Sequence, residues 1–162
     1  MAAATFAIDL PDERATSALA AALAARARRG DVIALSGPLG SGKTSFARGF
    51  IRARLGTSPG AGQDVPSPTF ALVEIYQPDS GPAIWHFDLY RLAMPDDAYE
   101  LGIEDAFAEG VALIEWPERL GARLPTEHLG IALAAGPRAT ARVATLRPSP
   151  GWADRIAGLT RG

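Results

Sequence analysis

The chain has 162 residues, 48% of them hydrophobic and 21% charged, so we expect residues 1–162 to form a single globular domain. It contains no cysteine, which excludes disulfides and thiolate zinc sites. The net charge of −2 argues against a protein that grips nucleic acid mainly through its own charge. The sequence shows neither a signal peptide nor an apolar stretch of about 18 residues, so we expect a cytoplasmic protein with no membrane segment.

The first third of the chain predicts two strands and two helices. Residues 5–10 have strand character, and a capped helix is expected over residues 12–29. The apolar run at residues 31–36 is typical of a buried parallel strand. A glycine-rich turn and a helix over residues 43–55 follow. Three apolar residues of this helix are expected in the core, namely Phe46, Phe50 and Ile51.

The remainder of the chain predicts further strands and short helices. Residues 57–68 are rich in Gly, Pro and Ser and are expected to form a mobile surface loop. The later elements are a strand pair at 70–77 and 83–88, a helix in two pieces over 94–108, a strand at 111–115, strands at 128–134 and 141–147, and a closing helix at 152–159. This alternation predicts an α/β fold with a sheet of mixed direction.

Residues 37–44 read Gly-Pro-Leu-Gly-Ser-Gly-Lys-Thr, which satisfies the phosphate-binding pattern G-x-x-x-x-G-K-[ST]. An apolar strand precedes the motif and an amphipathic helix follows it, which is the context that the motif requires. Small residues let successive backbone N–H groups converge on phosphate oxygens, and the helix adds its positive N-terminal end. We expect Lys43 to contact the β- and γ-phosphates of ATP and the Thr44 hydroxyl to coordinate Mg²⁺.

The composition singles out the same segment. The chain has 16 Lys and Arg residues, and Lys43 is the only lysine among them. Arginine serves wherever a generic positive charge suffices, whereas a tight phosphate-binding turn needs a compact ammonium group. The single lysine therefore stands where such a group is needed.

P-loop enzymes also need an acidic group, which usually follows a neighbouring buried strand. Asp88 and Glu115 both end such strands. One of them could hold the metal while the other orients a hydrolytic water, and spacing alone leaves these roles open. Ser67 and Thr69, at the end of the predicted loop, either sense the γ-phosphate as a nucleotide switch or simply begin a strand.

Three arginines of the predicted P-loop helix, Arg48, Arg52 and Arg54, are expected to be exposed. They either form a solvent-exposed face that stabilises the C-terminal end of the helix, or form a docking edge for a partner protein or tRNA. Both interpretations stay open on the sequence.

Five segments occur in a specific order along the chain. They are GPLGSGKTSFARGF at 37–50, SPTFALVEIY at 67–76, HFDLYRL at 86–92, ELGIEDAF at 100–107 and LIEWPERL at 113–120. Together they resemble the TsaE (YjeE) family, the ATPases of bacterial tRNA threonylcarbamoyladenosine (t6A) synthesis. The resemblance covers residues 9–133, and the tail after Leu133 matches weakly. Pro38 stands where the family usually has Asp, and Ser45 where it often has Thr.

The resemblance implies a P-loop NTPase-like three-layer fold with a largely parallel central sheet and added antiparallel strands. It implies that Thr44 and Glu115 bind Mg²⁺ and that Asp88 lies near the γ-phosphate, so that Lys43 and Asp88 are the expected catalytic residues. The expected ATP-binding residues are Thr16 in the first helix, Gly37, Leu39, Gly40, Ser41, Gly42, Lys43, Thr44, Ser45, Thr69 and Trp116.

Members of the family hydrolyse ATP slowly alone and act in a complex with TsaB and TsaD, in which TsaD modifies adenosine 37 of tRNA. The resemblance therefore implies an Mg-dependent ATPase subunit that meets tRNA mainly through its partners. Two alternatives are a P-loop small-molecule kinase and a non-catalytic, ATP-gated interaction module in which Asp88 is structural.

Overall fold

The computed structural model of the chain describes residues 5–56 and 65–159. The strands are β1 (Phe6–Leu10), β2 (Val32–Ser36), β3 (Val73–Tyr76), β4 (Ile84–Asp88), β5 (Val111–Glu115), β6 (Leu129–Ala135) and β7 (Arg142–Pro148). The α-helices are α1 (Glu13–Ala24), α2 (Lys43–Leu55), α3 (Ile103–Glu109) and α4 (Pro150–Ile156). Short 3-10 helices are η1 (Pro95–Leu101), η2 (Pro117–Arg123) and η3 (Ala157–Leu159).

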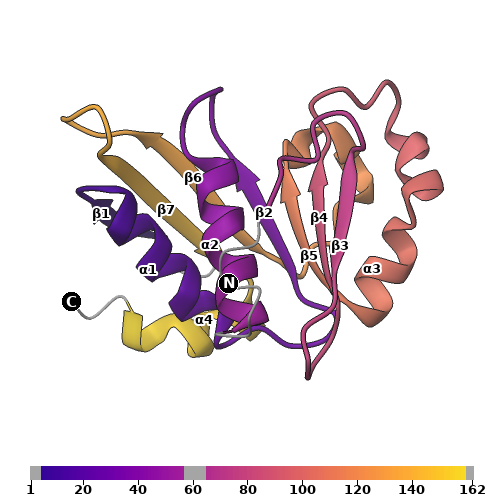
Figure 1. Cartoon of the computed structure of the whole chain (residues 1–162), viewed down its shortest axis with the longest axis horizontal. Helices are drawn as coiled ribbons and strands as arrows, with labels where there is room; N and C mark the ends of the chain where they lie inside the picture. The colour runs from indigo at the N-terminus through magenta and orange to yellow at the C-terminus, as the bar shows by residue number, and fades with distance from the viewer. Residues whose placement is uncertain (1–4, 57–64, 160–162) are drawn as a thin grey trace.

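The strands form one sheet in the order β1-β7-β6-β2-β5-β4-β3 (Figure 1). The central strands β6, β2, β5 and β4 pair in parallel. At the edges, β7 and β1 on one side and β3 on the other add antiparallel pairs. The predicted α/β class with a largely parallel centre is confirmed, and the full burial of β5 explains its continuous apolar run.

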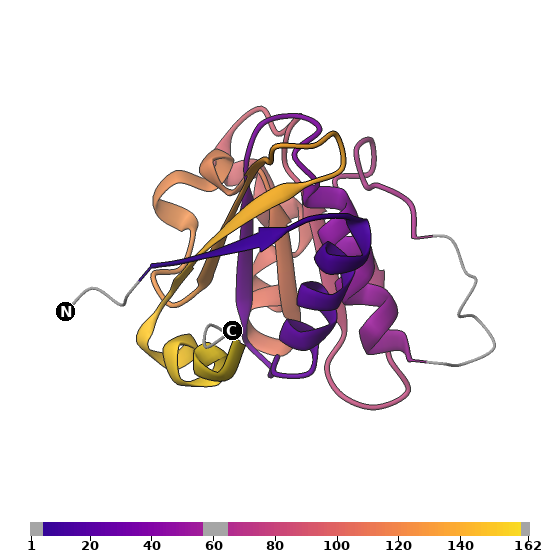
Figure 2. The same ribbon diagram turned by 90° about the vertical axis from the view of Figure 1, so that its left-hand side faces the viewer.

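Helices cover both faces of the sheet, which gives three layers. On one face, α1, α2 and α4 contribute buried side chains such as Leu23 and Phe46. On the other face, η1, α3 and η2 contribute a second cluster that includes Ile103 and Leu120. Figure 2 shows α1 and α2 on one side of the sheet and η2 on the opposite side.

Helix α2 begins and ends where the sequence predicts. Gly42 precedes it with φ +101°, a left-handed conformation that glycine adopts without strain, and Gly56 follows its last residue. Phe46, Phe50 and Ile51 are fully buried, as predicted from their spacing. This packing fixes the helix firmly against the sheet and so positions its first turn.

Helix α1 ends at Ala24 and is therefore shorter than the predicted helix, which extended to about Arg29. Arg26 lies beyond the helix, and its guanidinium donates hydrogen bonds to the carbonyls of Ala22 at 2.6 Å and Arg155 at 2.9 Å. The second contact ties this segment to α4, from the far end of the chain. A helical pattern read locally does not reveal such a contact.

Of the three arginines predicted to be exposed on α2, only Arg52 is so. Arg48 is half-buried, and its Nε donates to the Val65 carbonyl at 2.7 Å. Arg54 is also half-buried and donates to the Ala24 carbonyl at 3.4 Å. Two of these side chains are therefore engaged within the fold.

Most of the predicted loop at 57–68 lies outside the described residues, which resume at Val65. The strand expected from Phe70 begins only at Val73, because a turn precedes it in which the Leu72 N–H donates to the Pro68 carbonyl at 2.6 Å. Helix η2 was not predicted. Within residues 5–56 and 65–159, no helix has the length and apolar character needed to cross a membrane.

We expect Phe50→Ala to lower the free energy of unfolding by about 3–5 kcal/mol, because it leaves a cavity beneath α2 where the ring is 0% exposed. Chemical denaturation would measure the loss. Arg52→Ala, on the exposed side of the same helix, serves as the control and should change stability by no more than about 0.5 kcal/mol. Equal losses in both variants would contradict this assignment of the core.

Candidate nucleotide-binding site

Three parallel strands end at one edge of the sheet, beside the start of α2. Strand β2 ends at Ser36, β4 at Asp88 and β5 at Glu115, and the last two residues are register partners. Ligands of α/β sheets bind at the carboxyl ends of the strands. The fold thus brings the glycine-rich turn together with both carboxylates that the sequence singled out.

The turn between β2 and α2 is closely packed. Gly37 has φ +139°, and a Cβ added to it would lie 2.4 Å from the carbonyl oxygen of Leu133 and 2.6 Å from Oγ of Ser41. Only glycine fits at this position. No side chain in the described ranges caps the start of α2, so the N–H groups of its first turn can face an anion.

Lys43 lies at the centre of the site and is only 5% exposed. Its Nζ donates hydrogen bonds to the carbonyl oxygens of Gly37 at 2.6 Å and Pro38 at 2.9 Å. It also lies 4.2 Å from the centroid of the Trp116 ring, in a cation–π contact. The ammonium group is therefore fixed within the turn that precedes it.

Burial lowers the pKa of Lys43 below its ordinary value, and the negative charges of Glu115, Glu118 and Asp88 oppose that effect. Burial is the larger influence. A charged ammonium in such a desolvated place interacts with an anion more strongly than one on an open surface.

Glu115 is 2% exposed and holds two hydrogen bonds, one on each carboxylate oxygen. The Thr44 hydroxyl donates to its Oε1 at 2.8 Å. Nε2 of His86, which is fully buried, lies 2.6 Å from its Oε2. The first turn of α2 is thereby linked directly to the end of β5.

Asp88 is held by a different set of groups. The Tyr90 N–H donates to its Oδ1 at 3.1 Å, and the Thr69 hydroxyl donates to its Oδ2 at 3.3 Å. Oγ of Ser67 lies 2.7 Å from the Thr69 hydroxyl oxygen. The segment predicted as a possible switch is thus connected to the carboxylate predicted to be catalytic.

Trp116 forms part of the wall of the site. Its backbone has φ +60°, which is unusual for a bulky residue and costs energy. Its ring lies 4.9 Å from that of Tyr90, at an interplanar angle of 49°. This conformation turns the chain sharply after Glu115 and brings the indole over Lys43.

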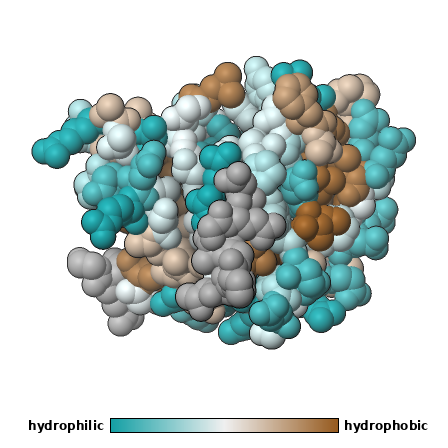
Figure 3. Space-filling model, viewed as in Figure 1, coloured by the Kyte–Doolittle hydropathy of each residue, from teal (hydrophilic) through white to brown (hydrophobic). Residues whose placement is uncertain are grey.

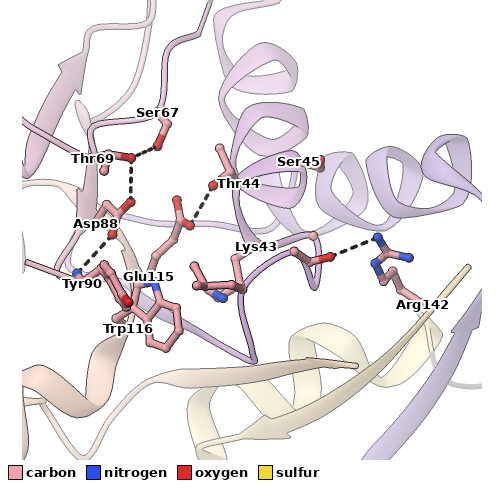
Figure 4. A pocket seen from close by; sticks show the side chains of 13 residues that line it. Lys43, Thr44, Ser45, Ser67, Thr69, Asp88, Tyr90, Glu115, Trp116 and Arg142 are labelled. Carbon is pink, nitrogen blue, oxygen red and sulfur yellow. Dashed lines mark hydrogen bonds between the residues drawn. The ribbon is translucent and has the colours of Figure 1, made fainter. Parts of the chain in front are cut away.

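These groups enclose a cavity of about 290 Å³. Figure 4 shows Lys43 between acidic and hydroxyl side chains on one side and Arg142 on the other. The lining residues are Leu39, Gly40, Gly42, Lys43, Thr44, Ser45, Ser67, Thr69, Asp88, Tyr90, Glu115, Trp116 and Arg142.

Three residues expected to contact ATP do not line this cavity. Gly37 and Ser41 lie within the turn, where Ser41 is 4% exposed. Thr16 is 3% exposed, and its hydroxyl donates to the Asp12 carbonyl at 3.5 Å. Their contacts with nucleotide stay predictions.

Two residues that line the cavity, Tyr90 and Arg142, were not predicted from the sequence as site residues. Tyr90 follows Asp88 closely in HFDLYRL, so the motif itself was a signal. Arg142 gave none, because it lies in the weakly matching tail. Its Nε donates to the Ser41 carbonyl at 3.0 Å and its Nη2 to the Gly40 carbonyl at 3.1 Å, so the guanidinium braces the glycine-rich turn.

The donor atoms are of the kind that Mg²⁺ prefers, namely carboxylate and hydroxyl oxygens. Within the described parts of the chain, no group of three or more His, Asp or Glu side chains is arranged to hold a metal ion. Mg²⁺ in nucleotide sites usually has only one or two protein ligands and takes the others from phosphate and water. Thr44 and Glu115 are therefore suitable protein ligands for an Mg²⁺ ion whose other ligands come from the nucleotide phosphates and water.

A comparison with family models gives a match to "Threonylcarbamoyl adenosine biosynthesis protein TsaE" over residues 10–143. A solved structure, that of Bacillus subtilis YdiB, superposes with a TM-score of 0.77 and 28% identity and covers 99% of this chain and 97% of that one. The shared fold extends over nearly the whole length of both chains.

Relatives named "tRNA threonylcarbamoyladenosine biosynthesis protein TsaE" give the same result. That of Bacillus subtilis is 39% identical over 124 residues, which cover 76% of this chain and 72% of the relative. That of Mycobacterium tuberculosis is 34% identical over 144 residues, with 84% and 83% covered. That of Rickettsia felis is 41% identical over 109 residues, which cover 67% of this chain but only 61% of the relative. With most of its length matched by the family model, the chain belongs to the TsaE family.

Proposed function

We propose that this chain is the ATP-binding subunit of tRNA threonylcarbamoyladenosine synthesis, acting in the cytoplasm, and that it hydrolyses ATP slowly with Mg²⁺. One observation carries the proposal: Lys43 and Thr44 open helix α2 directly opposite Glu115 and Asp88. A phosphate-binding turn that faces two carboxylates has the parts needed for phosphoryl transfer from a nucleotide. Membership of the TsaE family supports the role in tRNA modification.

Lys43 is the group proposed to hold the β- and γ-phosphates. An ammonium group has three donors, and two of them are used on the carbonyls of Gly37 and Pro38. The third is left for a phosphate oxygen. Because the first two contacts fix its position, the charge is in place before the nucleotide binds.

Thr44 and Glu115 are the proposed metal ligands. Their oxygens lie 2.8 Å apart, so both can turn from each other toward one ion. The loss of their mutual hydrogen bond is offset when the buried charge of Glu115 gains a cation. Bound Mg²⁺ supplies charge neutralisation at the β- and γ-phosphates.

Asp88 is proposed to orient the hydrolytic water. Each of its oxygens accepts one hydrogen bond, from Tyr90 and from Thr69, and each retains a lone pair. A carboxylate held in this way can accept a hydrogen bond from a water molecule and aim it at the γ-phosphate. Thr69 and Ser67 would then respond to the γ-phosphate as a switch.

We propose that the protein works with TsaB and TsaD and meets tRNA mainly through them. The net charge of −2 supports this division, since a chain that bound tRNA by itself would carry a basic surface. Leu39 and Phe70, beside the cavity, are 71% and 84% exposed. Figure 3 shows apolar side chains gathered over β3 and at the upper edge of the face that is turned toward the viewer. Such exposed apolar groups suit protein partners.

Lys43→Ala should weaken ATP binding about 100-fold or more, equivalent to about 2.8 kcal/mol, because it removes the buried charge that contacts the phosphates. Titration with labelled ATP in the presence of Mg²⁺ measures the change. Arg52→Ala, on the exposed face of the same helix, should bind ATP like the unmodified protein. Retention of full affinity by Lys43→Ala would refute the proposed site.

Glu115→Ala should weaken the Mg²⁺ dependence of ATP binding more than Asp88→Asn does, because only Glu115 shares a hydrogen bond with Thr44. Calorimetry with Mg²⁺ and with EDTA gives the two affinities for each variant. Asp88→Asn should instead lower turnover while ATP stays bound. The opposite ranking would exchange the roles of the two carboxylates.

TsaB and TsaD should be retained on the immobilised chain more strongly with ATP than with ADP, because Thr69 and Ser67 can sense the γ-phosphate. A pull-down with each nucleotide tests this expectation. Lys43→Ala is the control, and its retention of partners should not depend on the nucleotide added. Equal retention with ATP and ADP by the unmodified chain would count against the switch.

A further inference from the structure

His86 lies beneath the candidate metal site and is given no role by the proposed function. It is the third residue of β4 and is 0% exposed. Side chains alternate along a strand, so His86 shares its face with Ile84 and Asp88, toward α2. Its register partner on β5 is Leu113, two residues before Glu115. An imidazole therefore stands among apolar side chains directly below a buried carboxylate.

A histidine here needs an explanation, because an apolar residue would fill the same space without a desolvation cost. Within residues 5–56 and 65–159, its ring makes one hydrogen bond, which joins Nε2 to Oε2 of Glu115 at 2.6 Å. Its Nδ1 is buried and has no partner among the described residues. A buried N–H without an acceptor costs more than an unshared lone pair, so the proton belongs on Nε2, which then donates to Glu115.

This hydrogen bond gives the two carboxylate oxygens of Glu115 different partners. Oε2 is held from the interior of the protein by His86, and Oε1 faces the Thr44 hydroxyl at 2.8 Å. A glutamate side chain has several rotatable bonds, and fixing one oxygen restricts the direction of the other. We propose that His86 is a positioning residue that holds Oε2 of Glu115 and so presents Oε1, with the Thr44 hydroxyl, to Mg²⁺.

A comparison with Asp88 explains why Glu115 in particular needs the hydrogen bond from His86. Asp88 has a shorter side chain, and its carboxylate is held by the Tyr90 N–H and the Thr69 hydroxyl, both close to the cavity. Glu115 has no such neighbour for Oε2 in the described structure other than His86. Partners of this kind commonly orient metal-binding side chains, and their loss weakens metal affinity about 10- to 100-fold.

The inference rests on the proposed Mg²⁺ site, and its test separates the two. ATP affinity is measured by calorimetry with saturating Mg²⁺ and with EDTA for three variants. His86→Phe keeps a ring but removes the donor, His86→Asn keeps an amide that is too short, and His86→Gln keeps a donor at about the right reach. We expect the gain in affinity due to Mg²⁺ to fall about 10-fold or more in the first two variants and about threefold or less in His86→Gln.

Affinity in EDTA should change less than about twofold in all three variants, which a general loss of structure would not allow. His128→Gln is the matched control, because this histidine bonds the Pro125 carbonyl away from the site and should leave both affinities unchanged. If His86→Phe does not fold, the contrast between His86→Asn and His86→Gln carries the same comparison. In a Glu115→Ala background, replacing His86 should have no further effect on the metal dependence.

Three results would overturn the inference in different ways. If the unmodified protein gains affinity from Mg²⁺ and His86→Phe and His86→Asn gain as much, the positioning role fails while the metal site stands. If the unmodified protein gains nothing from Mg²⁺, the metal site fails and the role of His86 fails with it. A fall in affinity by the same factor with and without metal would show a structural role only.

Discussion

The hydrogen bond between Thr44 and Glu115 joins two segments that lie 71 residues apart in the chain. It depends on the parallel pairing of β2 and β5, in which Leu35 and Glu115 are register partners. A slip of one residue in β5 would turn Glu115 to the opposite face of the sheet and leave the start of α2 without a carboxylate. The candidate site therefore exists only while this register is kept. All five residues of β5 are buried, and the four apolar ones before Glu115 stabilise the strand in this register.

The parts of the structure that the sequence predicted well are those with local causes. Helix α2 has glycine at both ends and buried Phe46 and Phe50 at helical spacing, and its bounds agreed with the prediction. Asp88 and Glu115 were identified because each ends an apolar run, and parallel strands bring such ends to one edge. Local chemistry and one rule of topology were enough to predict most of the residues that line the cavity.

The parts that could not be predicted depend on contacts between distant segments. Arg142 braces the carbonyls of Gly40 and Ser41 across about a hundred residues of sequence. The segment after α1 is joined to α4 by the hydrogen bond from Arg26 to the Arg155 carbonyl, and the bond from His86 to Glu115 depends on the register of β4 against β5. Each of these side chains is ordinary in its local pattern, and only the folded arrangement gives it a partner.

The use of a lone lysine in a chain otherwise rich in arginine follows from the dimensions of the site. Nζ of Lys43 lies 2.6 and 2.9 Å from two carbonyl oxygens and 4.2 Å from the Trp116 ring, so the space suits a compact group. A planar guanidinium has five donors in a fixed fork, and those donors could not all be satisfied in the same space. Arginine can replace lysine on an exposed face such as that of Arg52, where solvent completes the hydrogen bonding. Within the glycine-rich turn, the geometry that fixes the ammonium also excludes the larger cation.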